Sequence, residues 1–72
     1  MAIPMHPVKS SQISYIGFDD EENKLYVTFT KTNKTYEYKE VPYSVWKALK
    51  ESTSIGSYFS ANIKGKYKYT EI

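Results

Sequence analysis

The chain has 72 residues and no cysteine, which predicts one small domain without disulfide bonds or thiolate metal sites. Its net charge of +2 is too weak to argue for nucleic-acid binding on charge alone. All ten basic residues are lysine, which lacks the planar guanidinium fork that reads guanine, so sequence-specific base recognition is not expected. An A/T-rich genome explains the excess of lysine equally well.

The first nine residues differ from the rest of the chain. Residues 1–9 contain Pro4 and Pro7, which favour a flexible N-terminal arm, and residues 10–72 are predicted to form the single domain. His6 has no histidine or cysteine partner and is interpreted as a solvated residue of the arm. No charged segment precedes a long apolar run, and no stretch reaches the ~20 apolar residues that span a bilayer. The protein is therefore expected to be cytoplasmic.

The first strand is predicted over residues 10–18, where apolar residues alternate along the chain. The residues that share a face are Ile13 with Tyr15, and Ile16 with Phe18. This change of phase predicts a β-bulge at Gly17. Ser10 and Ser11 are placed at the start of the strand, where they can contact a phosphate or form hydrogen bonds with the local backbone.

An acidic loop follows at residues 19–23. Its carboxylates are candidate ligands for a divalent cation, but the alternating ligand spacing and the glycine of a calcium loop are absent. The loop is interpreted as a solvated hairpin turn. The sequence predicts neither a metal site nor a cofactor.

A second hairpin is the clearest element of the sequence. Strands are predicted over residues 24–30 and 35–40, joined by a turn in which Asn33 takes a left-handed conformation. A turn centred on residues 32 and 33 fixes how the two strands pair. The pairs that it predicts are Phe29 opposite Tyr36, and Val27 opposite Tyr38.

Two helices are predicted after this hairpin. Pro42 suits the start of the first helix, because its missing amide hydrogen has no helical partner there. Trp46 has helical spacing from its apolar neighbours and is expected to be a core residue rather than a ligand platform. Ser54 and Gly56 mark the start of a second helix, which Gly65 ends. The buried stripe of that helix is predicted to contain Ile55, Phe59 and Ile63.

The chain is predicted to end in a strand over residues 66–72, with Tyr67 and Tyr69 on one face. The expected fold is α+β: an antiparallel β-meander of three strands, two short helices, and a C-terminal strand that joins the sheet. We expect the sheet to be open, with both helices on one of its faces.

The order of these motifs resembles the KTSC family, named after a domain at the C-terminus of some lysyl-tRNA synthetases. The resemblance covers nearly the whole chain, from about Val8 to Ile72. Phe18 and Ser60 depart from the family pattern, which tends to have tyrosine and asparagine there. The resemblance implies a small α+β domain, and the synthetase association suggests RNA binding. The residues that carry the resemblance are Ser10-Ser11, Ile13, Ile16-Gly17-Phe18-Asp19, Tyr36-Glu37-Tyr38, Val41-Pro42, Ser54, Gly56, Tyr58-Phe59, Ile63-Lys64, Tyr67 and Tyr69.

The residues favour a non-catalytic binding module. No nucleophile has a visible base to activate it, so an enzyme is not predicted. Tyrosines can stack on bases while lysines, including Lys39 and Lys66, neutralise phosphates, which favours RNA or another phosphate-bearing nucleotide ligand. Core packing is the alternative role for the strand tyrosines. The candidate ligand-binding residues are Ser10, Ser11, Tyr36, Tyr38, Ser54, Gly56, Tyr58, Lys64, Tyr67 and Lys68.

Two other functions stay open. A phage-type protein could sequester a small (cyclic) nucleotide signal at the helix start formed by Ser54 and Gly56, with Tyr58 covering the base at the interface of a homodimer or higher oligomer. At those two positions, an ordinary helix cap and a close packing contact are the structural alternative. A protein-interaction module without a small ligand could use an edge strand or the outward-facing Tyr26 and Tyr43.

Overall fold

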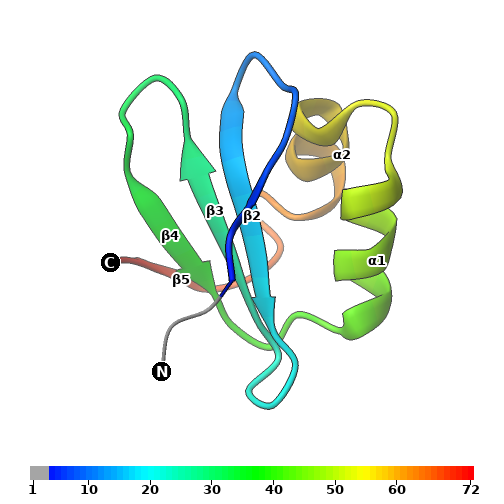
Figure 1. Ribbon diagram of the computed structural model, residues 1–72. Helices are drawn as coiled ribbons and strands as arrows, with labels where there is room; N and C mark the ends of the chain where they lie inside the picture. The colour runs from blue at the N-terminus through cyan, green and yellow to red at the C-terminus, as the bar shows by residue number, and fades with distance from the viewer. Residues whose placement is uncertain (1–3) are drawn as a thin grey trace.

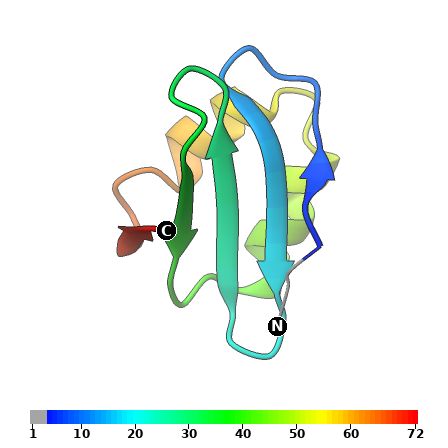
Figure 2. The same cartoon turned by 60° about the vertical axis from the view of Figure 1, so that its left-hand side comes forward.

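A computed structural model describes residues 4–72, which form one sheet covered by two helices (Figure 1). The sheet has five antiparallel strands in the order β1-β2-β3-β4-β5, and both helices lie on the same face of it (Figure 2). The predicted α+β class, the open sheet and the C-terminal strand that joins it are thereby confirmed. The elements in chain order are β1 (His6–Pro7), β2 (Ile13–Asp19), β3 (Lys24–Phe29), β4 (Thr35–Tyr38), α1 (Tyr43–Glu51), α2 (Ile55–Asn62) and β5 (Tyr69–Glu71).

The bulge in β2 lies at Ser14, so its predicted position at Gly17 is wrong. Ile13 pairs with Phe29 and Tyr15 with Thr28, which leaves Ser14 as the extra residue, whereas Gly17 pairs regularly. Ile13 and Ile16 are three residues apart and would face opposite sides of a regular strand. The extra residue turns both side chains into the core, where each is at most 1% exposed.

The pairing predicted between β3 and β4 is also wrong, by two residues. Val27 pairs with Tyr36 instead of Tyr38. Asn33 takes the predicted left-handed conformation, with φ 57°, and its amide donates to the carbonyl of Phe29 at 2.8 Å. The turn is therefore centred one residue earlier in the chain than the predicted centre at residues 32 and 33. Because side chains repeat every two residues along a strand, Tyr36 and Tyr38 keep the predicted face.

The helices follow the apolar pattern of the sequence. Pro42 is the N-cap of α1, and Trp46 is buried with its ring stacked on Phe18 at 5.7 Å between centroids, as expected of a core residue. Helix α2 begins directly after Ser54, as predicted, but it ends at Asn62 with Ile63 as its C-cap. The prediction that Gly65 ends this helix is therefore wrong, and Gly65, with φ 79°, lies in the turn that follows. Its buried stripe joins the two helices and the sheet in one core. The buried apolar residues are Ile13, Ile16, Leu25, Val27, Tyr38, Val41, Trp46, Leu49, Ile55, Phe59 and Ile63.

The two edge strands are short. β5 covers only part of the predicted residues 66–72, and it pairs with β4 so that Tyr69 lies opposite Tyr38. β1 was not predicted: His6 and Pro7 pair with β2, and the ring of His6 lies 6.1 Å from that of Trp46. The flexibility proposed for residues 1–9 remains a prediction, and residues 1–3 lie outside the described part.

Candidate functional site

Among the grooves on the surface of residues 4–72, two lie near the ends of β4, one at each end. The first, which we call the aromatic groove, consists of two adjoining hollows of about 410 and 100 Å³ between the β3–β4 loop and α2. Together they are comparable in size to small-molecule sites, which occupy about 300–1,000 Å³. The aromatic groove is lined by Ser11, Gln12, Phe29, Lys31, Thr32, Tyr36, Tyr38, Phe59, Ser60 and Lys64.

One wall of the aromatic groove is a series of interlocked rings. Phe29 meets Tyr36 and Phe59 edge to face, at 5.5 and 5.4 Å between centroids. Tyr38 meets Phe59 in the same way at 5.4 Å. Tyr69 extends the series, with its centroid 5.6 Å from Tyr36 and 5.3 Å from Tyr38, and it is 58% exposed. Because each ring is held by its neighbours, the wall is fixed before any ligand arrives.

The rim of the aromatic groove is polar and positively charged. Lys31 lies in the β3–β4 loop and Lys64 follows the end of α2, so the two lysines come from different parts of the chain. Among residues 4–72, the ion pairs are Lys24–Glu37 and Lys34–Glu71, and neither involves a rim lysine. No described residue that lines the groove carries a carboxylate. The rim is therefore suited to an anion.

Close packing against α2 holds the polar side of this groove in place. A Cβ atom on Gly56 would lie 3.1 Å from the hydroxyl oxygen of Ser10 and 3.3 Å from Oε1 of Gln12. The Ser10 hydroxyl accepts hydrogen bonds from the amides of Gln12, at 3.2 Å, and Ile13, at 3.4 Å. The space over Gly56 is thus filled by the chain itself, and Gln12 is held on the groove wall.

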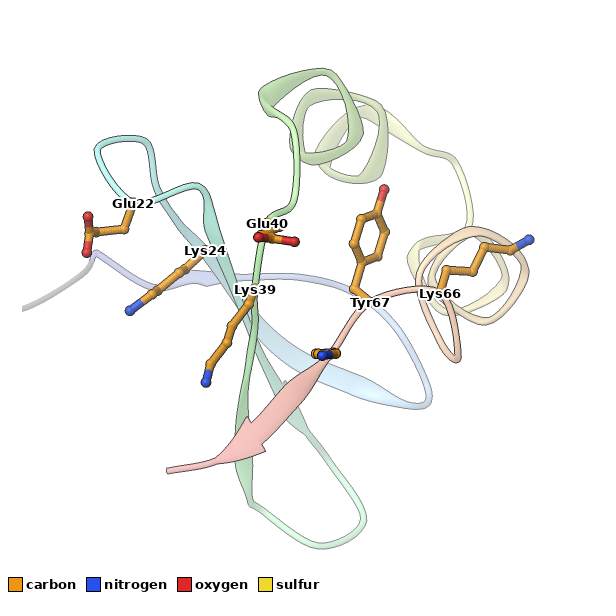
Figure 3. Close-up of a pocket in the computed structure, with 7 residues that line it drawn as sticks. Glu22, Lys24, Lys39, Glu40, Lys66 and Tyr67 are labelled. Carbon is orange, nitrogen blue, oxygen red and sulfur yellow. The ribbon is translucent and has the colours of Figure 1, made fainter.

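The second groove, which we call the lysine groove, has a volume of about 710 Å³ and lies where β3 begins and β4 ends (Figure 3). Lys24 and Lys39 extend in the same direction in Figure 3, whereas Lys66 points away from them. The Lys39 amide donates to the Lys68 carbonyl at 2.9 Å, so these two lysines lie on neighbouring segments of the backbone. The lysine groove is lined by Glu22, Lys24, Lys39, Glu40, Lys66, Tyr67 and Lys68.

Two tyrosine hydroxyls stay neutral well above physiological pH. Burial raises the pKa of Tyr38, on the aromatic groove, to about 12, and the neighbouring hydroxyls of Tyr69 and Tyr36 add to the effect. Burial also raises the pKa of Tyr26, on the opposite face, to about 12, assisted by its 2.9 Å hydrogen bond to Glu37.

Six of the ten predicted ligand residues line one of the two grooves, and four do not. Ser54 is exposed at the start of α2, and its side chain makes no cap hydrogen bond there. Tyr58 is half-buried and packs against the core, away from both grooves. Ser10 and Gly56 support the aromatic groove from behind. The candidates that line a groove are Ser11, Tyr36, Tyr38 and Lys64 in the first, and Tyr67 and Lys68 in the second.

Sequence reasoning did not assign several groove residues to a site. Phe29 was predicted to share a face with Tyr36, so its place on the wall was within reach of the pattern. Gln12, Lys31 and Thr32 lie in connections whose folding over the sheet leaves no periodic signal. The acidic loop is a hairpin turn, as predicted, and Asp19 accepts two backbone hydrogen bonds in it. Within residues 4–72, no cluster of three His, Asp or Glu side chains could hold a metal ion.

Comparison with known proteins identifies the family. The model of the KTSC domain matches residues 9–67, so the chain belongs to the KTSC domain family. The crystal structure of a KTSC domain protein from Yersinia pestis superposes with a TM-score of 0.94 at 34% identity, covering 99% of both chains. An uncharacterized protein of Stutzerimonas stutzeri is 35% identical over 66 residues, 90% of this chain and 92% of its own.

A longer relative carries the same domain. The lysine–tRNA ligase of Nostoc punctiforme is 31% identical over 72 residues, which is all of this chain but only 13% of the ligase. The chain thus corresponds to a small part of that protein. Neither helix within residues 4–72 is long and apolar enough to cross a membrane.

Proposed function

We propose that this KTSC-family domain is a non-catalytic module that binds RNA or another phosphate-bearing nucleotide ligand in the aromatic groove. The observation that carries the proposal is the pairing of a fixed wall of rings with two lysines on a rim without carboxylates. A base can stack on the partly exposed rings of Phe29 and Tyr36, which the buried rings behind them hold in place. The ammonium groups of Lys31 and Lys64 can then meet its phosphate. Stacking on an aromatic side chain contributes about 1–3 kcal/mol per base.

A binding role fits the groove better than catalysis. The described residues that line it include the hydroxyls of Ser11, Thr32 and Ser60, but no histidine or carboxylate that could activate them. The rings are already held by their neighbours, so little conformational entropy is lost when a ligand arrives. This arrangement is suited to holding a ligand rather than transforming it.

RNA is the ligand class that the comparisons favour. One relative is named as a ligase that acts with a tRNA, and the matched part of it is this domain. The alternative, a nucleotide held at the start of α2, has less support, because Ser10 and Gln12 fill the space over Gly56. We therefore place the phosphate at Lys31 and Lys64 rather than at Ser54.

Fluorescence anisotropy with a labelled single-stranded hexauridylate RNA tests the proposal. Tyr36→Leu removes the ring that faces the rim, and we expect affinity to fall about five-fold or more, which corresponds to 1 kcal/mol of stacking. Lys64→Gln should weaken binding and flatten its dependence on salt by about 0.7 in log–log slope, the value for one phosphate contact on a single strand.

The matched controls are Tyr15→Leu and Lys47→Gln, which alter exposed side chains that line neither groove. Both should bind like the parent protein. A thermal-shift panel of nucleotides, cyclic nucleotides and short RNA extends the test to other ligands. The proposal fails if none of them binds, or if the control variants lose as much affinity as the groove variants.

A further inference from the structure

We infer that the ligand is a single-stranded nucleic acid that reaches both grooves, with the lysine groove holding backbone phosphates. This inference rests on the function proposed above and narrows its ligand to a chain of nucleotides. A mononucleotide is too short to use both grooves. Residues Tyr36 and Lys39 lie in different grooves, and their Cα atoms are three positions apart in an extended segment, roughly 10 Å. The odd spacing directs the two side chains to opposite faces of the sheet, so a ligand that uses both grooves must pass around the edge formed by β5.

The lysine groove gathers like charges, and within residues 4–72 three of its four lysines, Lys39, Lys66 and Lys68, form no ion pair. Lys39 and Lys68 lie directly opposite one another, since the pairing of Tyr38 with Tyr69 continues by one residue through the Lys39 amide. Like charges in this position destabilise a sheet unless an anion lies between them. Lys24 extends in the same direction as Lys39 (Figure 3), and Glu37 neutralises it only in part, at 3.8 Å.

The charge balance of the groove favours an anion. Its lining carries four lysines and two glutamates, a formal net charge of +2, and lysines still outnumber glutamates when Lys66, which points away, is left out. Lysine meets phosphate as a mobile point charge and does not read bases, so the groove suits a phosphodiester backbone of any sequence. The aromatic groove would then hold bases, and the lysine groove would hold phosphates.

The surface between the grooves leaves room for a nucleic-acid strand. β5 is the edge strand beside β4, and all three of its residues are exposed. Tyr69 adds an exposed ring to this edge, next to Tyr36 and Tyr38. A flexible single strand can pass around such an edge, stack a base on Tyr69 and reach Lys68, the residue that precedes β5.

The test measures the affinities of uridine monophosphate, diuridylate and hexauridylate for the parent protein and for a Lys39→Gln/Lys68→Gln double variant. We expect the parent to bind hexauridylate at least ten-fold more tightly than diuridylate, because the second contact becomes intramolecular. The double variant should lose this gain and lower the salt slope by about 1.4, the value for two phosphates on a single strand. Glu40→Gln should raise the affinity for hexauridylate.

The matched control is Lys9→Gln/Lys47→Gln, which removes the same charge from two exposed lysines that line neither groove. This control variant should still bind hexauridylate at least ten-fold more tightly than diuridylate. Equal affinity for diuridylate and hexauridylate, or a gain that survives in the lysine-groove variant, overturns the inference and leaves the proposed function standing. Competition by free tripolyphosphate as effective as that by hexauridylate also overturns it. Failure of all three uridylates to bind also overturns the inference, and failure of the whole nucleotide panel removes the proposed function as well.

Discussion

Substitution of Gly56 tests how closely α2 packs against the chain segment that supports the aromatic groove. Alanine in place of a helical glycine stabilises a helix by up to about 1 kcal/mol. Here the new Cβ atom would lie 3.1 Å from the Ser10 hydroxyl oxygen, which must move. That movement weakens two hydrogen bonds from the backbone to Ser10, of 3.2 and 3.4 Å. A hydrogen bond contributes about 0.5–1.5 kcal/mol, so their combined loss offsets the helical gain.

We therefore expect Gly56→Ala to lower the free energy of unfolding by about 1 kcal/mol, once the 3.3 Å approach to Gln12 is included. Ser10→Ala alone should cost about 1 kcal/mol, through the same two hydrogen bonds. In the double variant the closest obstacle is absent, and the helical gain should appear. The two substitutions should thus be coupled by about 1 kcal/mol or more, with the double variant more stable than the sum predicts.

Urea and thermal denaturation of the four proteins in this cycle, both followed by circular dichroism, measure the coupling. In a domain of this size, 1 kcal/mol corresponds to about 4–8 °C in Tm, which is well resolved. Effects that add within about 0.5 kcal/mol would show that the two positions are independent, contrary to this prediction. They would mean that Ser10 and Gln12 do not rest on α2.

Three further substitutions test other parts of the fold. Glu40 has φ 56°, so Glu40→Gly should raise the free energy of unfolding by about 1 kcal/mol. Gly65 has φ 79°, so Gly65→Ala should lower it by a similar amount. Urea titrations showing the opposite order of stability would contradict both predictions. The Tyr38 pKa of about 12 lies above the ordinary value of 10, so its stabilising effect is complete below pH 10 and is lost as the pH rises towards 12. Thermal unfolding of Tyr38→Phe should therefore depend less on pH across this window than that of the parent, and equal slopes would exclude the effect.

The sequence predicted the fold class because its strongest signals come from burial. Ile55, Phe59 and Ile63 recur at helical spacing, and all three are buried in the core. The alternation around Val27 likewise placed Tyr36 on the correct face even though its partner was wrong. Burial patterns fix which side of an element faces the core and are insensitive to a shift of two residues along a strand.

The remaining details depend on pairing that no single segment encodes. The sequence shows that the phase of β2 changes between Ile13 and Ile16, but only pairing with β3 places the extra residue at Ser14. β1 is two residues long and contains a proline, so it has no periodic signal. The aromatic groove joins the segment before β2, the β3–β4 loop and the end of α2. Its members are separated in sequence, and only packing brings them together.

Binding of a phosphate-bearing nucleotide chain against the ring wall can be followed in solution by titrating ¹⁵N-labelled protein with hexauridylate RNA and recording the amide chemical shifts. We predict the largest shifts at Gln12, Lys31, Tyr36 and Lys64, with a second group at Lys39 and Lys68. Shifts confined to the outer side of α1, or a spectrum that does not change at saturating RNA, would contradict the account.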